Sequence, residues 1–301
     1  MSELASGEDL YQWRQWAIHL AQAHSIDTEE VDWLLQGLTP LSSLSLRLGD
    51  YRDRLSILSK ADLTSLTAKW QQRISHRVPV QYLAGATPWR NFSIAVSPAV
   101  LIPRPETELI IDIAKALAAR NPLAEQLKQG HWADIGTGSG AIALGLAQQF
   151  PTAIIHATDI SPAALAVAQL NAQQNQLAER ITFYQGSWLS PLASLRGQLS
   201  AIISNPPYIP TQTVLTLQPE VAEHEPHLAL DGGPDGLACI RTLIADSTDY
   251  LQSGGIWLIE LMAGQAETVA DLLKKHSSYT DITIHRDLSG IHRFVSARKA
   301  L

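Results

Sequence analysis

The stretch 204–208, Ser-Asn-Pro-Pro-Tyr, has the residue types and spacing best suited to chemistry. It follows an apolar run at 199–203 that predicts a short buried strand. Two consecutive prolines cannot continue a sheet, because each lacks an N–H donor and has a fixed φ. The Asn205 side-chain oxygen and the Pro206 carbonyl can each accept a hydrogen bond from an NH2 group, and the Tyr208 ring can stack on the planar group that carries it. Taken alone, the same residues could equally form a proline-rich turn with a packed tyrosine.

A glycine-rich stretch at 134–141, Asp-Ile-Gly-Thr-Gly-Ser-Gly-Ala, follows a predicted strand at 131–135 and opens a predicted helix. Its glycines allow the backbone to turn tightly and a ligand to approach the helix N-terminus. Asp159 ends the next predicted strand, and a carboxylate at that position can hold both hydroxyls of a ribose. The two features together predict a nucleoside-type cofactor, although the same glycine pattern also fits a dinucleotide.

Trp188 follows the third predicted strand, where its indole could lie against an adenine ring or simply pack at the rim of the sheet. In an open α/β sheet, ligands bind outside the carboxyl ends of the strands, near the switch in strand order. We therefore expect the glycine-rich stretch, Asp159, Trp188 and Asn205 to converge on one cleft. A nicotinamide-dependent enzyme has no use for an NH2-binding turn in such a cleft, whereas a methyltransferase acting on an amide or an exocyclic amine does.

Strand-like and helix-like segments alternate from residue 131 onward. The predicted strands lie at 131–135, 153–158, 181–184, 199–203, 255–261, 281–285 and 293–297. The predicted helices lie at 141–149, 162–174, 236–251 and 265–276. This alternation predicts an α/β fold with a doubly wound, mostly parallel, seven-stranded Rossmann-like sheet and helices on both faces. The connection between the last two strands is short, so we expect them to pair antiparallel.

Residues 1–77 are predicted to form a small helical domain, with an all-helical pattern over 6–77. Four helices are predicted: from Ser6, from Asp27 to an end near Gly37, at 40–48 and at 62–76. The tryptophans of this region are more typical of core or groove anchors than of a cofactor site; they are Trp13, Trp16, Trp33 and Trp70. Because the bundle has no catalytic groups, it is a candidate substrate-docking domain.

Several prolines break the helical pattern between residues 78 and 105. A strand-like run at 89–96 lies among them, so we predict a β-hairpin linker at 78–105 that joins the helical domain to an α/β domain at 106–301. Arg104 stands at the end of this linker. It could bind an anion or pair with Glu106 or Glu108, and the sequence leaves this open.

The composition of the 301-residue chain narrows the function classes further. A net charge of −7 argues against a generally basic nucleic-acid binder, and 46% hydrophobic residues argue against global disorder. One cysteine, an acidic N-terminus without a secretory signal and the lack of a long apolar run favour a cytoplasmic protein with no membrane contact. No metal site is expected, because Pro226 interrupts the His- and Glu-rich segment 223–227.

Four segments together resemble the HemK-type release factor glutamine methyltransferases: 101–108 (Leu-Ile-Pro-Arg-Pro-Glu-Thr-Glu), 134–140, 205–208 and 225–237. The first and the last are the most specific of them. The resemblance covers about residues 78–298, with a looser match before them. It implies S-adenosylmethionine as the methyl donor and, as the substrate, the glutamine of the Gly-Gly-Gln motif in peptide chain release factors. No direct contact with nucleic acid is expected.

By position, the resemblance also assigns roles to individual residues. The implied cofactor contacts are Gly136, Thr137, Gly138, Ser139, Gly140, Asp159, Trp188 and Asn205. The implied substrate contacts are Asn205, Pro206, Pro207 and Tyr208, of which Asn205, Pro206 and Tyr208 would be catalytic. Ser187 and Met262 stand where the family commonly has an acidic residue and a glycine, respectively.

The chemistry that this turn suits requires alignment more than a strong base. An amide nitrogen is a poor nucleophile because its lone pair is delocalised. Acceptors on Asn205 and Pro206 can hold both of its N–H bonds and aim it at a methyl donor. Two other hypotheses stay open: an adenine-N6 or other nucleic-acid amino-methyltransferase, which could use the same turn on a flipped base, and a non-catalytic nucleoside-binding docking protein.

Overall fold

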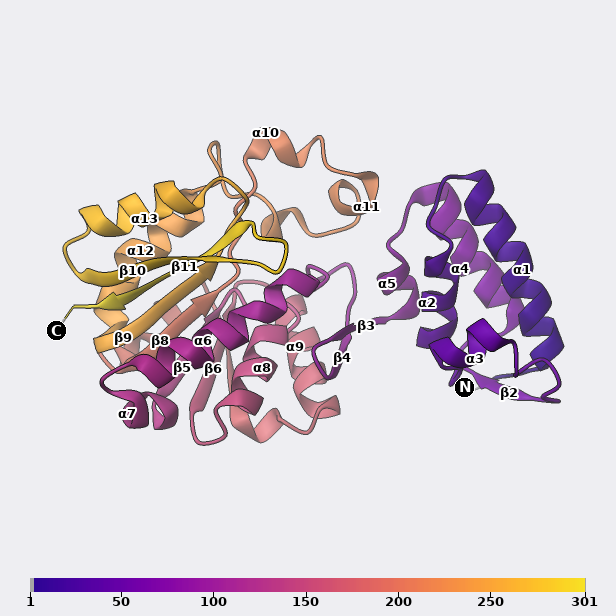
Figure 1. Ribbon diagram of the computed structural model, residues 1–301, viewed down its shortest axis with the longest axis horizontal. Helices are drawn as coiled ribbons and strands as arrows, with labels where there is room; N and C mark the ends of the chain where they lie inside the picture. The colour runs from indigo at the N-terminus through magenta and orange to yellow at the C-terminus, as the bar shows by residue number, and fades with distance from the viewer. Residues whose placement is uncertain (1–2, 301) are drawn as a thin grey trace. The chain divides into compact units, whose positions relative to one another are not determined.

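The computed structural model describes residues 3–300 of the chain (Figure 1). The chain forms two compact units. The helical unit contains the residues up to Thr87 together with Gln218–His224, and the sheet unit contains Pro88–Leu217 and the residues from Glu225 onward. The chain therefore passes between the units at Thr87, at Leu217 and at His224.

Short polar side chains begin three helices of the helical unit. Ser6, Ser42 and Asp62 each accept a hydrogen bond from the backbone N–H three residues further on, which satisfies a free donor of the first turn. The helices of this unit are α1 (Gly7–Ala23), α2 (Glu29–Leu38), α3 (Ser43–Leu48), α4 (Leu63–His76), α5 (Val80–Ala84) and α11 (Pro219–Ala222).

A two-stranded antiparallel sheet interrupts the helical pattern of this region. Strand β1 (Glu3–Ala5) pairs with strand β2 (Ile57–Ser59). The prediction that 6–77 is all helical is therefore wrong at β2. The pairing partner lies more than fifty residues earlier, so the local sequence pattern carries no sign of it.

Gly37 packs against another helix and does not end its own. Helix α2 continues through it to Leu38, so the predicted helix end is wrong. A Cβ at Gly37 would lie only 2.7 Å from the Cβ of Ala84 on α5. The close contact with α5 places residues 78–87 in the helical unit, where the sequence predicted the start of a linker.

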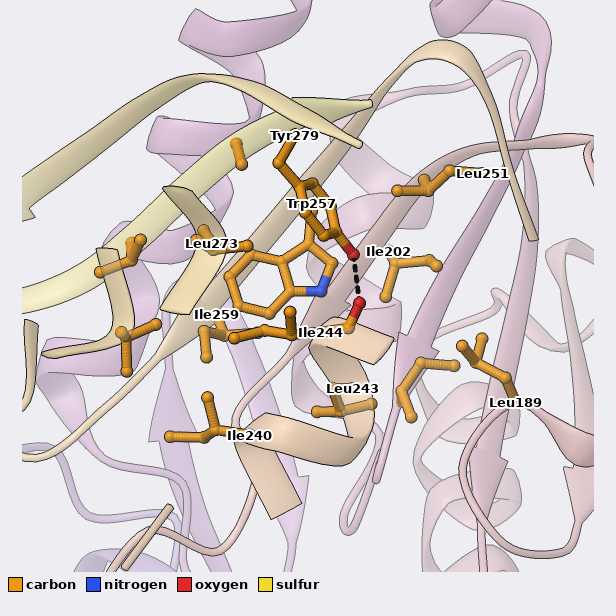
Figure 2. Packing of buried hydrophobic residues seen from close by; sticks show 14 of the residues in the cluster. Leu189, Ile202, Ile240, Leu243, Ile244, Leu251, Trp257, Ile259, Leu273 and Tyr279 are labelled. Atoms are coloured by element: carbon orange, nitrogen blue, oxygen red, sulfur yellow. Dashed lines mark hydrogen bonds between the residues drawn. The ribbon is translucent and has the colours of Figure 1, made fainter. Parts of the chain in front are cut away.

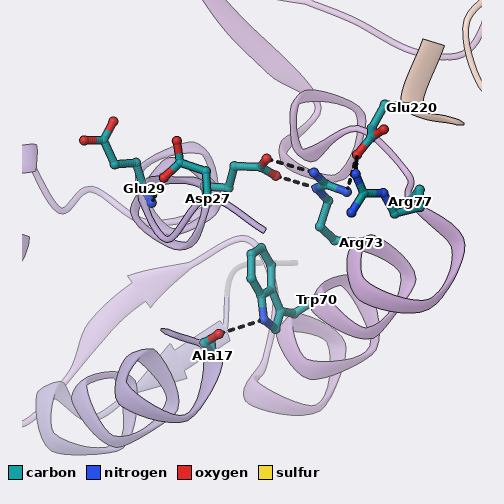
Figure 3. Close-up of polar contacts among 8 residues, drawn as sticks. Ala17, Asp27, Glu29, Trp70, Arg73, Arg77 and Glu220 are labelled. Carbon is teal, nitrogen blue, oxygen red and sulfur yellow. Dashed lines mark hydrogen bonds and ion pairs between the residues drawn. The ribbon is translucent and has the colours of Figure 1, made fainter. Parts of the chain in front are cut away.

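The core of the helical unit includes Trp70 of α4, which is fully buried. Its indole N–H donates to the Ala17 carbonyl on α1 at 3.2 Å (Figure 3). Trp13 is also buried, and its indole donates to the Thr67 hydroxyl at 3.1 Å. The core role predicted for the tryptophans is confirmed for these two, whereas Trp16 is 39% exposed.

A buried arginine ties the short helix α11 into the helical unit. Arg73 on α4 donates to both carboxylate oxygens of Glu30 on α2, at 2.5 and 2.9 Å. The same guanidinium lies 2.9 Å from Oε1 of Glu220 on α11, and Arg77 lies 2.6 Å from that oxygen (Figure 3). Charges on α4 thus hold a segment that is remote in the sequence.

A second two-stranded sheet consists of β3 (Ala86–Trp89) and β4 (Phe92–Ala95). The expected hairpin is therefore present, but the strand-like run at 89–96 is not one strand. Arg90 has a φ of 52°, in the left-handed region, so the chain turns at Arg90 and Asn91.

The sheet unit contains a seven-stranded sheet in the order β10-β11-β9-β8-β5-β6-β7 (Figure 1). Its strands are β5 (His131–Ile135), β6 (Ile154–Asp159), β7 (Ile181–Gln185), β8 (Leu199–Ser204), β9 (Leu251–Glu260), β10 (Tyr279–Arg286) and β11 (His292–Lys299). Neighbours among β5 to β9 run parallel, and β11 runs antiparallel to both β9 and β10. The predicted mostly parallel sheet with an antiparallel last pair is confirmed.

Helices cover both faces of this sheet (Figure 1). One face carries α6 (Leu109–Arg120), α8 (Ala141–Gln149) and α9 (Pro162–Gln174), and the other carries α12 (Ala238–Tyr250) and α13 (Ala266–Lys275). Shorter helical segments are α7 (Ala124–Gln129), α10 (Thr211–Val214) and the 3-10 turns Pro105–Glu108, Ala178–Arg180, Ser190–Leu195 and His227–Ala229.

The side of the sheet under α12 and α13 holds a large buried hydrophobic cluster (Figure 2). Trp257 of β9 lies in it, fully buried, together with Ile244 of α12 and Leu273 of α13. The Tyr279 hydroxyl donates to the Ile244 carbonyl at 2.7 Å, so this polar group is satisfied inside the core. None of the helices within residues 3–300 has the length and apolar character that a membrane crossing requires.

Candidate active site

The strand register brings several loops to one edge of the sheet. The parallel pairs align Ile135 with Ser204 and Ser204 with Ile259, near the carboxyl ends of β5, β8 and β9. Ile135 also aligns with Thr158 near the end of β6. Strand β5 lies between β6 and β8, so this edge includes the switch in strand order where open α/β sheets bind ligands. The glycine-rich loop and the Asn-Pro-Pro-Tyr turn follow two of these adjacent strand ends.

Positive φ angles shape the glycine-rich loop. Gly136, Gly138 and Gly140 have φ values of 73°, 55° and 83°, which residues with a Cβ rarely adopt. A Cβ at Gly140 would also lie 3.1 Å from the Cβ of Ala168, so this glycine lets α8 approach α9. Gly136 and Gly138 line the cavity, while Gly140 serves helix packing.

A buried carboxyl group fastens this loop to the sheet. Asp134 is fully buried, and its Oδ2 accepts hydrogen bonds from the Thr137 hydroxyl at 2.5 Å and from the Ala143 N–H at 3.0 Å. Burial raises the pKa of Asp134 to about 7, although both hydrogen bonds act in the opposite direction. The Thr137 hydroxyl is therefore engaged inside the protein.

Asp159 connects the loop to the end of β6. Its Oδ2 accepts the Gly138 N–H at 2.9 Å, and its Oδ1 accepts the Ser161 N–H at 2.9 Å. A carboxylate oxygen can accept more than one hydrogen bond, so both oxygens keep capacity for ligand hydroxyls.

A cavity of ≈ 310 Å³ opens among these loops within the sheet unit. The predicted site residues that line it are Gly136, Thr137, Gly138, Ser139, Asp159, Trp188, Asn205 and Pro207; those that do not are Gly140, Pro206 and Tyr208. Apolar side chains that the sequence did not mark form much of the remaining wall: Val100, Leu101, Ile142, Ile160 and Leu228. Within residues 3–300, no group of three or more His, Cys, Asp or Glu residues could hold a metal ion.

Trp188 lies beside the first glycine of the loop. A Cβ at Gly136 would lie 3.8 Å from Cζ3 of the indole. Trp188 follows β7 and has a φ of 49°. Its carbonyl accepts a hydrogen bond from the Thr158 hydroxyl at 2.9 Å, which ties the Trp188 backbone to the end of the neighbouring strand β6. The half-buried indole therefore forms a flat wall of the cavity.

The turn after β8 is held on both sides. The Ser204 hydroxyl donates to the Ile135 carbonyl at 2.6 Å and joins the turn to β5. Asn205 lines the cavity, and its Nδ2 donates to the Thr107 hydroxyl oxygen at 3.4 Å. The Tyr208 hydroxyl donates to Oε1 of Glu260 at 3.3 Å, and Tyr208 does not line the cavity.

The glycine-rich segment 230–237 supports this turn by close backbone contact. A Cβ on Gly232 would lie 2.8 Å from the Tyr208 Cα, and one on Gly236 would lie 2.3 Å from the Tyr208 carbonyl oxygen. The Gln265 side-chain amide donates to the carbonyls of Tyr208 and Gly236 at 2.9 and 3.3 Å. Glycine is therefore required at positions 232 and 236, because the turn leaves no room for a side chain there.

Arg104 pairs with a distant glutamate and not with its sequence neighbours. Its Nη2 lies 2.9 and 2.7 Å from the two carboxylate oxygens of Glu225, whose side chain is 1% exposed. Burial raises the pKa of Glu225, and Arg104 opposes that shift. This pair joins the 101–108 segment to the 225–237 segment.

Glu260 is a further residue at this edge that the sequence did not predict as functional. It ends β9 and is fully buried. Burial raises its pKa to about 7. Its position at the end of a strand that reaches the carboxyl edge is the signal that could have found it.

Comparisons with known proteins agree with this geometry. Residues 109–233 match the Methyltransferase small domain. The release factor glutamine methyltransferase of Synechocystis sp. is 53% identical, over 97% of this chain and 97% of its own length. That of Thermosynechococcus vestitus is 47% identical, over 97% of this chain and 99% of its own. This chain belongs to the release factor glutamine methyltransferase family. It is therefore a methyltransferase, and the resemblance noted in the sequence is confirmed.

Solved structures share the fold at low identity. The hMettl16 catalytic domain in complex with MAT2A 3′UTR hairpin 1 has a TM-score of 0.55 and 13% identity, over 94% of this chain and 90% of that one. The same domain with hairpin 6 has a TM-score of 0.53 and 16% identity, over 79% of this chain and 81% of that one. These likenesses support the methyltransferase fold and nothing finer, whereas the family rests on the sequence relatives.

Proposed function

We propose that this protein transfers a methyl group from S-adenosylmethionine to the side-chain amide nitrogen, N5, of the glutamine in the Gly-Gly-Gln motif of peptide chain release factors. The observation that carries the proposal is the position of Asn205, which lines the cavity beside the glycine-rich loop. The relatives named release factor glutamine methyltransferase add support. In this role the protein works in the cytoplasm and modulates translation termination.

The residues that line the cavity fit S-adenosylmethionine. Gly136 and Gly138 have no side chain to block approach to the helix end, and Asp159 offers two acceptor oxygens to the ribose hydroxyls. The flat Trp188 indole and the apolar side chains of Val100 and Ile160 provide walls against which an adenine ring can pack. Bound there, S-adenosylmethionine would supply a methyl group activated by the positive charge on its sulfur, and that carbon–sulfur bond would break as the carbon–nitrogen bond to the amide forms.

The turn residues hold the nitrogen that receives the methyl group. The Asn205 oxygen and the Pro206 carbonyl each accept one N–H of the glutamine amide, which removes the freedom of that nitrogen to turn away. Well-oriented reactions reach effective molarities of about 10⁵–10⁸ M, so alignment supplies much of the acceleration. Both acceptors gain strength as positive charge grows on nitrogen. One amide proton then leaves to water, and the other stays on the methylated nitrogen.

The helical unit is proposed to dock the release factor. Every residue that lines the cavity belongs to the sheet unit, so the helical unit is free of the chemistry. A short Gly-Gly-Gln segment offers little area for recognition, and a second contact surface would supply the rest of the affinity.

The test of the proposed function is the substitution Asn205→Ala. Loss of a preorganised polar contact in a catalytic site costs about 10²–10³ in kcat, so we expect at least that loss here. The measurement is single-turnover methyl transfer from labelled S-adenosylmethionine to purified release factor, with a thermal melt as the folding control. Near-normal transfer by a folded Asn205→Ala protein would contradict the role of the turn.

Parallel reactions separate the other hypotheses. Labelled methyl transfer to DNA or RNA, with none to release factor, would favour a nucleic-acid amino-methyltransferase. Calorimetry that detects NAD binding and no S-adenosylmethionine binding would refute the cofactor. Cofactor binding without transfer to any of these substrates would favour a docking protein.

A further inference from the structure

A buried carboxyl group lies behind the amide-binding turn without reaching the cavity. Glu260 is fully buried and is not among the cavity-lining residues. Its Oε1 accepts the Tyr208 hydroxyl at 3.3 Å, and its Oε2 has no hydrogen-bond partner at standard distance in the described chain. Among its neighbours, the Thr107 hydroxyl lowers the pKa of this carboxyl group most, followed by the Arg293 charge and the Tyr208 hydroxyl. A buried carboxyl group with so few partners opposes folding, which suggests a role in function.

Thr107 connects this carboxyl group to Asn205. Its side chain is buried, and its Oγ1 accepts the hydrogen bond from Asn205 Nδ2. A hydroxyl has one proton and two lone pairs, so a Thr107 that accepts from Asn205 still has its own proton to donate. An ionised carboxylate only accepts. Thr107 is the strongest of the neighbours that favour the ionised form of Glu260, so an ionised Glu260 attracts the Thr107 proton and favours one order: the Asn205 amide donates to the Thr107 hydroxyl, and that hydroxyl points its own proton toward the carboxylate.

The direction matters because the two ends of an amide side chain are chemically opposite. With Nδ2 on Thr107, the Oδ1 of Asn205 faces away from Thr107 and is left to the cavity that Asn205 lines. A substrate amide that presents N–H groups needs an acceptor there. If Asn205 flipped, its own NH2 group would face the substrate NH2 group, and two donors would meet without an acceptor.

We propose that Glu260 and Thr107 are positioning residues that hold the Asn205 side chain with its oxygen toward the substrate. The inference rests on the proposed amide methylation and extends it, because it names what makes the turn specific for an NH2 group. Both residues affect the reaction through Asn205.

The protonation state of Glu260 gives this arrangement a pH dependence. Burial raises the pKa of Glu260 to about 7, and the Glu106 charge acts in the same direction. The groups facing it that lower its pKa are Thr107, Arg293 and Tyr208. A protonated Glu260 can donate to Thr107, whose own proton then turns toward Asn205 and favours the flipped amide. The rate of methyl transfer should therefore rise with pH through about 7.

The experiment compares three variants of the full chain: Glu260→Gln, Thr107→Val and Thr107→Ser. Glu260→Gln keeps the shape but removes the charge, Thr107→Val removes the hydroxyl, and Thr107→Ser restores it. The measurement is single-turnover transfer from saturating labelled S-adenosylmethionine to purified release factor, across the pH range around 7. Saturation with the cofactor separates this profile from any titration of Asp134, which lies under the cofactor loop.

We expect Glu260→Gln and Thr107→Val to lower kcat by about 10- to 100-fold, as a misplaced contact does, with the KM for release factor little changed. Both should lose the rise in rate near pH 7, whereas Thr107→Ser should stay close to the wild type in rate and profile. The double variant should be no worse than either single one, because both changes break the same chain. Calorimetry should show unchanged S-adenosylmethionine binding in Glu260→Gln, because Glu260 does not line the cavity. Thr107 does line it, so its valine variant is compared with the serine variant for cofactor binding as well.

Wild-type rates and a wild-type pH profile in both Glu260→Gln and Thr107→Val would overturn the inference while leaving the proposed function intact. No transfer by the wild-type protein, despite cofactor binding, would overturn the proposed function and this inference with it. If Glu260→Gln fails to fold, Thr107→Val against Thr107→Ser decides alone, since the carboxyl group stays in place in both. Equal loss in the valine and serine variants would also count against the inference.

Discussion

At the scale of single residues, polar side chains that line the cavity are also held by hydrogen bonds within the protein. Asp159 is the clearest case, because its two oxygens accept the Gly138 and Ser161 N–H groups while the residue also lines the cavity. Thr137 is another, since its hydroxyl is bound to the buried Asp134. A substitution at such a residue therefore changes both a ligand contact and the shape of the loop.

Asp159→Ala should weaken S-adenosylmethionine binding by about 1–3 kcal/mol, the usual cost of losing a charged hydrogen-bond partner. The loop contact to Gly138 is lost as well. Asp159→Asn is the matched control, because it keeps one acceptor oxygen and should lose less. Calorimetry of the cofactor gives both dissociation constants, and an unchanged value in Asp159→Ala would remove this residue from the site.

The buried Asp134 predicts how stability responds to pH. Its pKa in the folded chain, about 7, lies above the usual 3.8 because burial disfavours the charge. Between these values the folded state binds more protons than the unfolded one, so this group's contribution to stability falls as pH rises through about 7. Asp134→Asn removes the titration. The free energy of unfolding of the variant, minus that of the wild type, should therefore increase from acidic to alkaline pH.

Denaturant unfolding on the two sides of pH 7 measures this difference. Glu260 titrates in the same range but is present in both proteins, so its contribution cancels. A difference that stays constant across the range, or that changes in the opposite direction, would contradict the pKa shift of Asp134.

At the scale of elements, local sequence patterns predicted the helices and strands whose ends are set by residues next to them in the sequence. The helices at 141–149 and 162–174 coincide with α8 and α9, because a glycine loop and a Ser-Pro start mark their beginnings. The strands of the sheet were predicted to within a few residues, since short apolar runs between turn residues mark them. The cavity-facing loops followed from the rule that ligands bind at the carboxyl edge.

What the sequence missed depends on contacts between distant residues. The sequence predicted a helix end at Gly37, but a glycine is needed there because a side chain would collide with Ala84. The partner of Arg104 is Glu225, and no local pattern distinguishes it from the glutamates nearby. The support of the Tyr208 turn by Gly236 is of the same kind. Such pairings become visible only when the chain is folded.

The supporting role of Gly236 leads to a prediction. It has a φ of 74°, and a Cβ there would lie 2.3 Å from the Tyr208 carbonyl oxygen and 2.7 Å from Nε2 of Gln265. Gly236→Ala should therefore displace the turn and lower kcat, in addition to the cost of about 1–2 kcal/mol for a Cβ at positive φ. Gly197→Ala is the matched control, because Gly197 has a φ of 71° with nothing within 4 Å of its Cβ position.

Unfolding measurements and single-turnover transfer on both alanine variants separate the two effects. Gly197→Ala should lose stability only, with a normal rate of transfer. A normal rate in Gly236→Ala as well would mean that the 230–237 segment does not support the turn.

At the scale of the whole molecule, the chain divides into two compact units. The helical unit has its own buried core, and the cavity is lined entirely by the sheet unit. The segment 218–224 is the exception to a simple order along the chain, because it leaves the sheet unit shortly after the Asn-Pro-Pro-Tyr turn and is held by Arg73 and Arg77. A truncation at the predicted boundary, residue 77, would cut α5 from α2, so residue 87 is the better limit.

Removal of the residues up to Thr87 should leave S-adenosylmethionine binding largely intact and raise the KM for release factor by about tenfold or more, which corresponds to about 1.4 kcal/mol of lost docking energy. The KM for a short Gly-Gly-Gln peptide should not change, because such a peptide does not use the docking surface. Full-length Glu220→Gln is the control for the freed 218–224 segment, since it weakens the pairs with Arg73 and Arg77 but keeps the helical unit. If Glu220→Gln raises the KM for release factor as much as the truncation does, the helical unit acts by holding that segment and not by docking. If the truncated protein methylates intact release factor with an unchanged KM, both explanations fail and the helical unit has no part in substrate recognition.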